Sequence, residues 1–136
     1  MYAEVSDLKA RLGDVFDAIY ENESDAEDDL TDAEAEVDGC ISRRFKTPVT
    51  AIRSLPLLKG WTLTLCEERS YSRAAGSTYA EKVSSRVAQV RKYLDDVKNG
   101  LFTLPGAEEA SDEVSGGISM IAGDEPIFTR ENMKGY

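Results

Sequence analysis

Carboxylates are the most abundant reactive side chains of this sequence, and they gather in its first forty residues. Asp28 and Asp32 lie four positions apart, as two ligands of a calcium-binding loop would. Such a loop also needs an oxygen ligand at its third position and glycine at its sixth, where this chain has Leu30 and Ala33. We therefore expect no metal site here, and we interpret these acids as one exposed helix face.

Other residue types that support catalysis are absent or isolated. The chain has no histidine, so it lacks the commonest general base and the commonest transition-metal ligand. Cys40 and Cys66 form no CxxC pair, and we expect free, buried thiols rather than a disulfide. The sequence contains no phosphate-binding loop, nucleophile elbow or dinucleotide fingerprint. These features predict a protein that is not an enzyme and uses no cofactor.

The charge of the chain changes sign along its length. Residues 1–40 carry a net charge of −12, residues 41–100 carry +7, and residues 101–136 carry −5, which gives the total of −10. A protein of this overall charge is repelled by nucleic-acid phosphates. The charges are either solvated helix faces or complementary surfaces, acidic against basic, on identical subunits packed head to tail.

Hydrophobic spacing predicts two helical regions in the first half of the chain. Residues 6–21 have a helical pattern that Gly13 interrupts, and Ser6 is a suitable N-cap. Residues 22–29 are expected to be an acidic loop or a first turn. A long helix then runs from residue 30 to Phe45, and it ends before Pro48 because the residue preceding a proline disfavours the helical conformation.

Two further helices are expected in the second half. One begins near Ser54 and ends near Gly76; residues 61–65 also alternate like a strand, but we favour the helix because no partner strand is evident. The next begins with a capping box at Thr78 and has the clearest amphipathic stripe in the chain, ending before Gly100. The stripe consists of Tyr79, Val83, Val87, Val90, Leu94 and Val97.

These elements predict an all-α fold, a small bundle of about four helices with an extended C-terminal arm. We expect residues 1–104 to form the helical body and residues 105–136 to form the arm. The arm contains more apolar residues than a merely solvated tail would, and residues 118–129 are suited to join a partner's sheet as a strand. The sequence shows neither a secretory signal nor a membrane-spanning run, so we expect synthesis in the cytoplasm.

Three segments together resemble a known family. Residues 1–8 (MYAEVSDL), residues 32–39 (DAEAEVDG) followed by Arg44, Phe45 and Pro48, and residues 127–136 (IFTRENMKGY) are similar to small proteins encoded in the head-gene region of Mu-like tailed phages. The resemblance implies a head–tail adaptor, also called a connector or neck protein. It implies an α-helical subunit without catalytic activity.

The resemblance further implies a homo-oligomeric ring, usually of twelve subunits, in the virion neck beneath the portal vertex. Its partners would be the portal protein and a tail-side neck or tail terminator protein, and DNA would pass through the lumen without specific binding during ejection. The partner contacts we expect lie in the arm, and they are Phe128, Arg130, Met133 and Tyr136. Glu34 and Asp38 are the acids we expect to face the lumen. The alternative is an acidic regulatory or inhibitory protein, a DNA mimic that binds a host protein.

Overall fold

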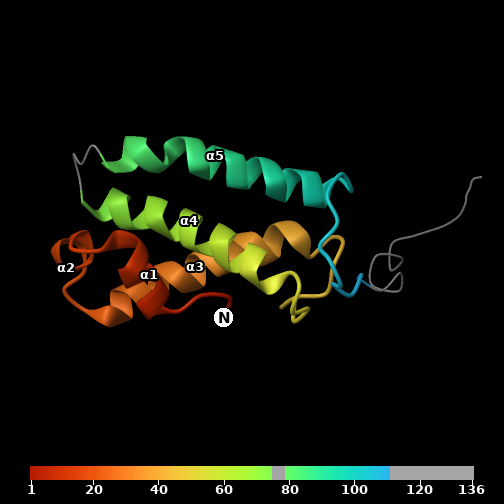
Figure 1. Cartoon of the computed structure of the whole chain (residues 1–136), viewed down its shortest axis with the longest axis horizontal. Helices are drawn as coiled ribbons and strands as arrows, with labels where there is room; N and C mark the ends of the chain where they lie inside the picture. The colour runs from red at the N-terminus through yellow and green to blue at the C-terminus, as the bar shows by residue number, and fades with distance from the viewer. Residues whose placement is uncertain (75–78, 111–136) are drawn as a thin grey trace, which may run out of the picture.

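The structure is a computed structural model of the whole chain, and it describes residues 1–74 and 79–110. In these residues five helices follow one another: α1 (Val5–Leu12), α2 (Val15–Ile19), α3 (Glu23–Ile41), α4 (Leu55–Arg73) and α5 (Tyr79–Lys98). The three long helices α3, α4 and α5 lie side by side, and the short α1 and α2 pack near one end of this group (Figure 1). The predicted all-α bundle is confirmed for the described part of the chain.

The break between α1 and α2 falls where the sequence predicts it. Gly13 has a φ of +61°, in the left-handed region that glycine adopts at little cost, and Leu12 and Phe16 on either side are buried. The predicted N-cap is wrong, because Glu4 takes that position and Ser6 lies inside the helix. The carboxylate of Asp7 accepts a hydrogen bond of 2.9 Å from the backbone N–H of Glu4, which closes a capping box.

Helix α3 differs from its prediction at both ends. It begins at Glu23, so residues 23–29, which we expected to be an acidic loop or first turn, are helical. Ala26 and Leu30 are both fully buried and continue one apolar stripe, while acids in the first turn suit the positive end of the helix dipole. At the other end the helix stops at Ile41, and Phe45 is buried beyond it rather than within it.

Helix α4 occupies the centre of the bundle. Residues 61–65 are helical, as favoured over a strand, and every residue from Trp61 to Glu67 is buried. The burial on all sides arises because α1, α2, α3 and α5 all contact α4. The strand-like alternation of the sequence therefore reflects a helix without a solvent-facing side in this stretch.

Helix α5 covers α4 and α3 with the predicted stripe. Its residues Val83, Val87, Val90, Leu94 and Val97 are buried. Gly100 follows the helix with a φ of +82°, and a Cβ atom there would lie 2.9 Å from Nη1 of Arg44. Glycine is favoured at this position by its backbone conformation, while the Arg44 guanidinium, at the end of a flexible side chain, could shift to admit a Cβ atom.

The chain after α5 returns onto the body. The rings of Trp61, Tyr93 and Phe102 pack with centroids 5.9 Å apart in each pair, and Leu104 is buried. Further on, the N–H of Lys46 donates to the carbonyl oxygen of Glu108 (2.8 Å), and the N–H of Ala110 donates to that of Arg44 (2.9 Å). Residues 108–110 therefore lie along residues 44–46. The remainder of the predicted arm, including the strand expected at residues 118–129, lies outside the described residues.

Within the two described stretches, no helix has both the length and the apolar character needed to cross a membrane.

Candidate functional site

The predicted partner contacts fall beyond the part of the chain that the structure describes. They are Phe128, Arg130, Met133 and Tyr136, and they stay predictions.

Glu34 and Asp38, the predicted lumen acids, both bind Tyr2. The backbone N–H of Tyr2 donates to Oε1 of Glu34 (2.9 Å), and its hydroxyl donates to Oδ1 of Asp38 (2.5 Å). The same hydroxyl accepts a hydrogen bond of 2.9 Å from the N–H of Val49. We call this arrangement the Tyr2 clasp. It joins the N-terminal segment, the middle of α3 and the loop before α4.

The clasp also perturbs the ionisation of its members. Burial, followed by the hydrogen bond to Asp38, raises the pKa of the Tyr2 hydroxyl. Burial likewise raises the pKa of the Asp38 carboxyl, against the lowering effect of its hydrogen bond with Tyr2. The position of Glu34 and Asp38 in a ring is not defined by one subunit, so their lumen-facing role stays a prediction.

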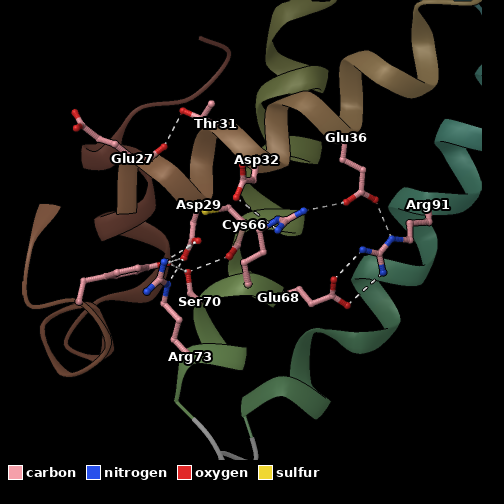
Figure 2. Close-up of polar contacts among 12 residues, drawn as sticks. Glu27, Asp29, Thr31, Asp32, Glu36, Cys66, Glu68, Ser70, Arg73 and Arg91 are labelled. Carbon is pink, nitrogen blue, oxygen red and sulfur yellow. Dashed lines mark hydrogen bonds and ion pairs between the residues drawn. The ribbon is translucent and has the colours of Figure 1, made fainter. Parts of the chain in front are cut away.

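Acids of α3 pair with arginines of α4 and α5 (Figure 2). Arg91 of α5 lies 3.1 Å from Glu36 of α3 and 2.8 Å from Glu68 of α4, so it links all three long helices. Arg69 of α4 lies 3.9 Å from Asp32 and 3.7 Å from Glu36. Hydrogen bonds to Glu68 and then Glu36 raise the pKa of Arg91. Part of the acidic N-terminal charge is thus matched by basic charge inside one subunit.

A second network is buried between α2, α3 and α4. Arg73 donates to Asp29 through Nε (2.7 Å) and Nη2 (3.1 Å), and the hydroxyl of Tyr20 donates to the same carboxylate at 2.6 Å. Oγ of Ser70 lies 2.6 Å from the Tyr20 hydroxyl, and it also donates to the carbonyl oxygen of Cys66 (2.9 Å). Figure 2 shows Asp29, Arg73 and Ser70 converging here. Since the Tyr20 hydroxyl binds both Asp29 of α3 and Ser70 of α4, the network is suited to holding helices together.

Glu67 is the most deeply buried acid of the described residues. Its side chain is 3% exposed and lies on α4, where it pairs with Arg11 of α1 and with Arg86 of α5 at 3.2 Å. Two cations around one buried carboxylate satisfy its charge with hydrogen bonds from opposite sides. The arrangement fixes α1 and α5 relative to the central helix.

The cysteines and the two acids compared with a calcium loop, Asp28 and Asp32, show no reactive or metal-binding arrangement within the described residues. Both cysteines are free, as expected; Cys66 is buried and Cys40 is half-buried. Burial raises the pKa of the Cys66 thiol to about 12, which disfavours its reactive thiolate. Asp28 and Asp32 lie one turn apart within α3, and among the described residues no three or more potential ligands converge on a metal position.

Charges without an ion pair among the described residues gather at opposite ends of the bundle. Arginines without an ion pair in these stretches lie in the segment between α3 and α4, at the end where the chain leaves α5 (Figure 1), and they are Arg43, Arg44 and Arg53. Six acids without an ion pair in the described part of the chain lie around α2 and the first turns of α3, and they are Asp14, Asp17, Glu21, Asp25, Glu27 and Asp28; Glu4, Glu34, Asp38 and Glu109, which also have none there, lie elsewhere. The body therefore has an acidic end and a basic end.

Comparison with known proteins identifies the family. Residues 2–122 match the family described as Bacteriophage Mu, Gp36. The chain belongs to this Gp36 family. No curated protein matches it. The predicted resemblance to Mu-like phage proteins is confirmed at this level, and membership of the Gp36 family indicates a structural or morphogenetic phage protein.

The Gp36 match covers the whole described body. It stops before residues 127–136, so the C-terminal segment that contributed to the predicted resemblance and holds the expected partner contacts lies beyond it. Family membership supports a phage protein associated with the virion, without assigning a role to individual residues.

The polar residues that join this Gp36-family body were mostly missed in the sequence. Glu67 directly follows an apolar run, but the adjacent Glu68 and Arg69 make it look like the start of an exposed, charged stretch, so its burial had no clear local signal. Tyr2 stood in a segment used for the family resemblance, but no local signal linked it to Glu34, Asp38 and Val49, which lie 32 to 47 positions away.

Proposed function

We propose that this Gp36-family protein is a head–tail adaptor. Subunits form a ring, of twelve copies by resemblance, between the portal and a tail-side neck or terminator protein, and DNA passes through the lumen. The observation that carries the proposal is the family match over residues 2–122. It agrees with the likeness of residues 1–8 and 32–39 to proteins encoded among phage head genes.

The body has properties that suit a ring subunit. Three sets of contacts each connect different elements, so the bundle is held together as one body. They are the Tyr2 clasp, the hydrogen bonds of Asp29 with Tyr20 and Arg73, and the pairing of Glu67 with Arg11 and Arg86. Among the described residues, a group of six unpaired acids around α2 and unpaired arginines between α3 and α4 lie at opposite ends, so neighbouring copies can meet through unlike surfaces with complementary charge. Contacts between unlike surfaces generate a ring when the rotation between copies closes.

The arm is the proposed contact with the portal or with the next subunit. The last described residues, 108–110, lie along residues 44–46, so the arm departs from the basic end of the bundle. From there Phe128, Arg130, Met133 and Tyr136 would supply apolar and cationic contacts to the neighbour.

Sedimentation velocity of the purified chain, alone and mixed with the portal oligomer of its own phage, tests the adaptor role. The proposal predicts comigration at about one chain per portal subunit, since an adaptor ring matches the portal in copy number. A chain that remains monomeric and does not bind the portal would refute it. A variant truncated after Gly117 tests the arm: it is expected to keep its melting temperature and lose comigration.

A further inference from the structure

An exposed isoleucine stands on a rigid turn at the basic end of the bundle. Ile52 is 83% exposed, and the adjacent Arg53 is exposed and has no ion pair among the described residues. The carbonyl oxygen of Ala51 accepts hydrogen bonds from the N–H groups of Ser54 (2.9 Å) and Leu55 (3.1 Å). Ser54 is fully buried, and its hydroxyl donates to the carbonyl oxygen of Pro105 at 2.6 Å. This segment, residues 51–54, is called the Ile52 turn below.

A surface hollow of complementary chemistry lies on another part of the same subunit. It has a volume of about 390 Å³ and lies between the start of α1 and the second turn of α3. Met1 and Val5 provide its apolar lining and Glu4 and Glu27 its acidic lining, with Ser6 completing it. Neither glutamate forms an ion pair among the described residues. We call it the Met1 hollow.

Both surfaces are held in place before any partner binds. The Tyr2 clasp fixes the segment that carries Met1, and Oγ1 of Thr31 lies 3.9 Å from the sulfur of Met1. The Ile52 turn is held by the start of α4 and by Pro105. Association of ordered surfaces costs less conformational entropy than association of mobile ones.

We propose that the Ile52 turn of one copy docks into the Met1 hollow of a second copy. Ile52 then buries its side chain against Met1 and Val5, while Arg53 meets Glu4 and Glu27. The inference deepens the adaptor proposal, because it names the surfaces that join neighbouring subunits of the ring. Burial of an exposed apolar side chain favours association, and the charges set the orientation.

The chemistry of the two surfaces favours a second copy of this chain over nucleic acid. DNA phosphates would attract Arg53 but offer no apolar contact for Ile52, and they would be repelled by Glu4 and Glu27. The contact joins two different surfaces, so residue 52 of one copy meets the hollow of the next and never meets another residue 52.

Site-directed disulfide formation tests this contact on the full-length chain. In a Cys40→Ser background, a chain with Ile52→Cys is mixed at high concentration with a tagged chain carrying Ser6→Cys, and the mixture is oxidised mildly. Ser6 is exposed and lines the hollow. The matched control replaces Ser6→Cys with Ser85→Cys, at an exposed position of α5 outside the hollow.

The proposal predicts a several-fold excess of mixed 52–6 dimers over 52–52 dimers, 6–6 dimers and the 52–85 control. A 52–6 yield no higher than the control, including no dimers at all, would overturn it. Arg53→Glu and Glu27→Arg are each expected to lower the 52–6 yield, and the two changes together to restore it at least in part. A double variant no better than either single variant would contradict the predicted Arg53–Glu27 contact.

The cross-linking assay uses the chain alone, whereas the adaptor role is tested by comigration with the portal. The two can therefore fail separately. Cross-links without portal binding would support the interface between copies and refute the adaptor role. Portal binding without 52–6 cross-links would support the adaptor role and refute the proposed interface.

Discussion

Glu67 and its neighbour Glu68 allow the energetic value of burial to be measured with two matched variants. Both acids lie on α4 and both bind arginines, but the side chain of Glu67 is 3% exposed whereas that of Glu68 is 37% exposed. Removing one partner of a fully buried ion pair costs about 3–5 kcal/mol. The arginines of Glu67 keep some contact with water, since Arg11 is 33% and Arg86 is 51% exposed. We therefore expect Glu67→Gln to cost about 2 kcal/mol, which is below that range because the arginines remain partly solvated.

Glu68→Gln is the control, because a solvent-exposed ion pair contributes about 0–1 kcal/mol. Urea unfolding at neutral pH gives the free energy of unfolding of each variant directly. In a thermal melt, about 2 kcal/mol corresponds to a fall of roughly 8 °C for a body of this size. Equal losses in the two variants would refute the argument that burial of the carboxylate raises the cost of removing its charge.

Three further changes follow from the same contacts. Tyr2→Phe removes the only acceptor for the buried N–H of Val49 among the described residues, so it should lower the free energy of unfolding in urea by about 1–3 kcal/mol. Tyr93→Phe is the control and should cost little, because the Tyr93 hydroxyl forms no hydrogen bond within the described residues. Burial raises the pKa of Asp38, so the stability associated with its protonated form is present below its unfolded pKa of about 4 and is lost as pH rises through the higher folded value. The melting temperature of Asp38→Asn minus that of the unchanged protein should therefore rise as pH is raised from about 3 to about 7. A difference that stays constant over this range would contradict the prediction. Cys66 should react with a thiol reagent only on unfolding, and rapid labelling of the native protein, with its other thiol replaced by serine, would show that it is accessible.

Periodicity and backbone chemistry were sufficient to predict most of the fold. The interruption at Gly13 and the stripe that ends at Val97 were correctly placed because glycine and apolar spacing act locally. The start of α3 was misplaced because its acids were interpreted as a loop, although Ala26 is buried on the same stripe as Leu30. Phe45 continued the helical spacing, but its environment is set by residues 108–110, which lie far along the chain.

The distribution of charge was readable in the sequence, but its pairing was not. Acidic and basic segments could equally have met between two subunits or within one. In the structure, Asp29 and Glu36 of α3 meet Arg73 and Arg91 within one subunit. A DNA mimic needs its carboxylates free to replace phosphates, and these two are already bound to arginines. Among the described residues, the largest group of acids without an ion pair lies at the α2 end, so an acidic surface that could meet a partner is most extensive there.

The hydrogen bonds of Glu34 and Asp38 with Tyr2 change how repulsion between the lumen and DNA has to be tested. Reversing Glu34 and Asp38 would remove the acceptors of the Tyr2 clasp, so slower DNA ejection could arise from damage to the fold. Glu34→Gln with Asp38→Asn removes both charges and keeps oxygen acceptors for Tyr2. Asp17→Lys with Asp28→Lys reverses charge at the α2 end, where both side chains are exposed and have no ion pair among the described residues.

Ejection kinetics of phages carrying each pair of changes, with melting temperatures of the purified chains as the control, separate the two surfaces. If acidic repulsion keeps DNA from adhering to the lumen, the pair that faces the lumen slows ejection while its melting temperature is no lower than that of the unchanged protein. Slowing by the Glu34 and Asp38 pair would place the clasp side of α3 at the lumen, and slowing by the Asp17 and Asp28 pair would place the α2 end there. Normal ejection in both would contradict repulsion by these acids, because it would show that neither charged surface acts on the passing DNA.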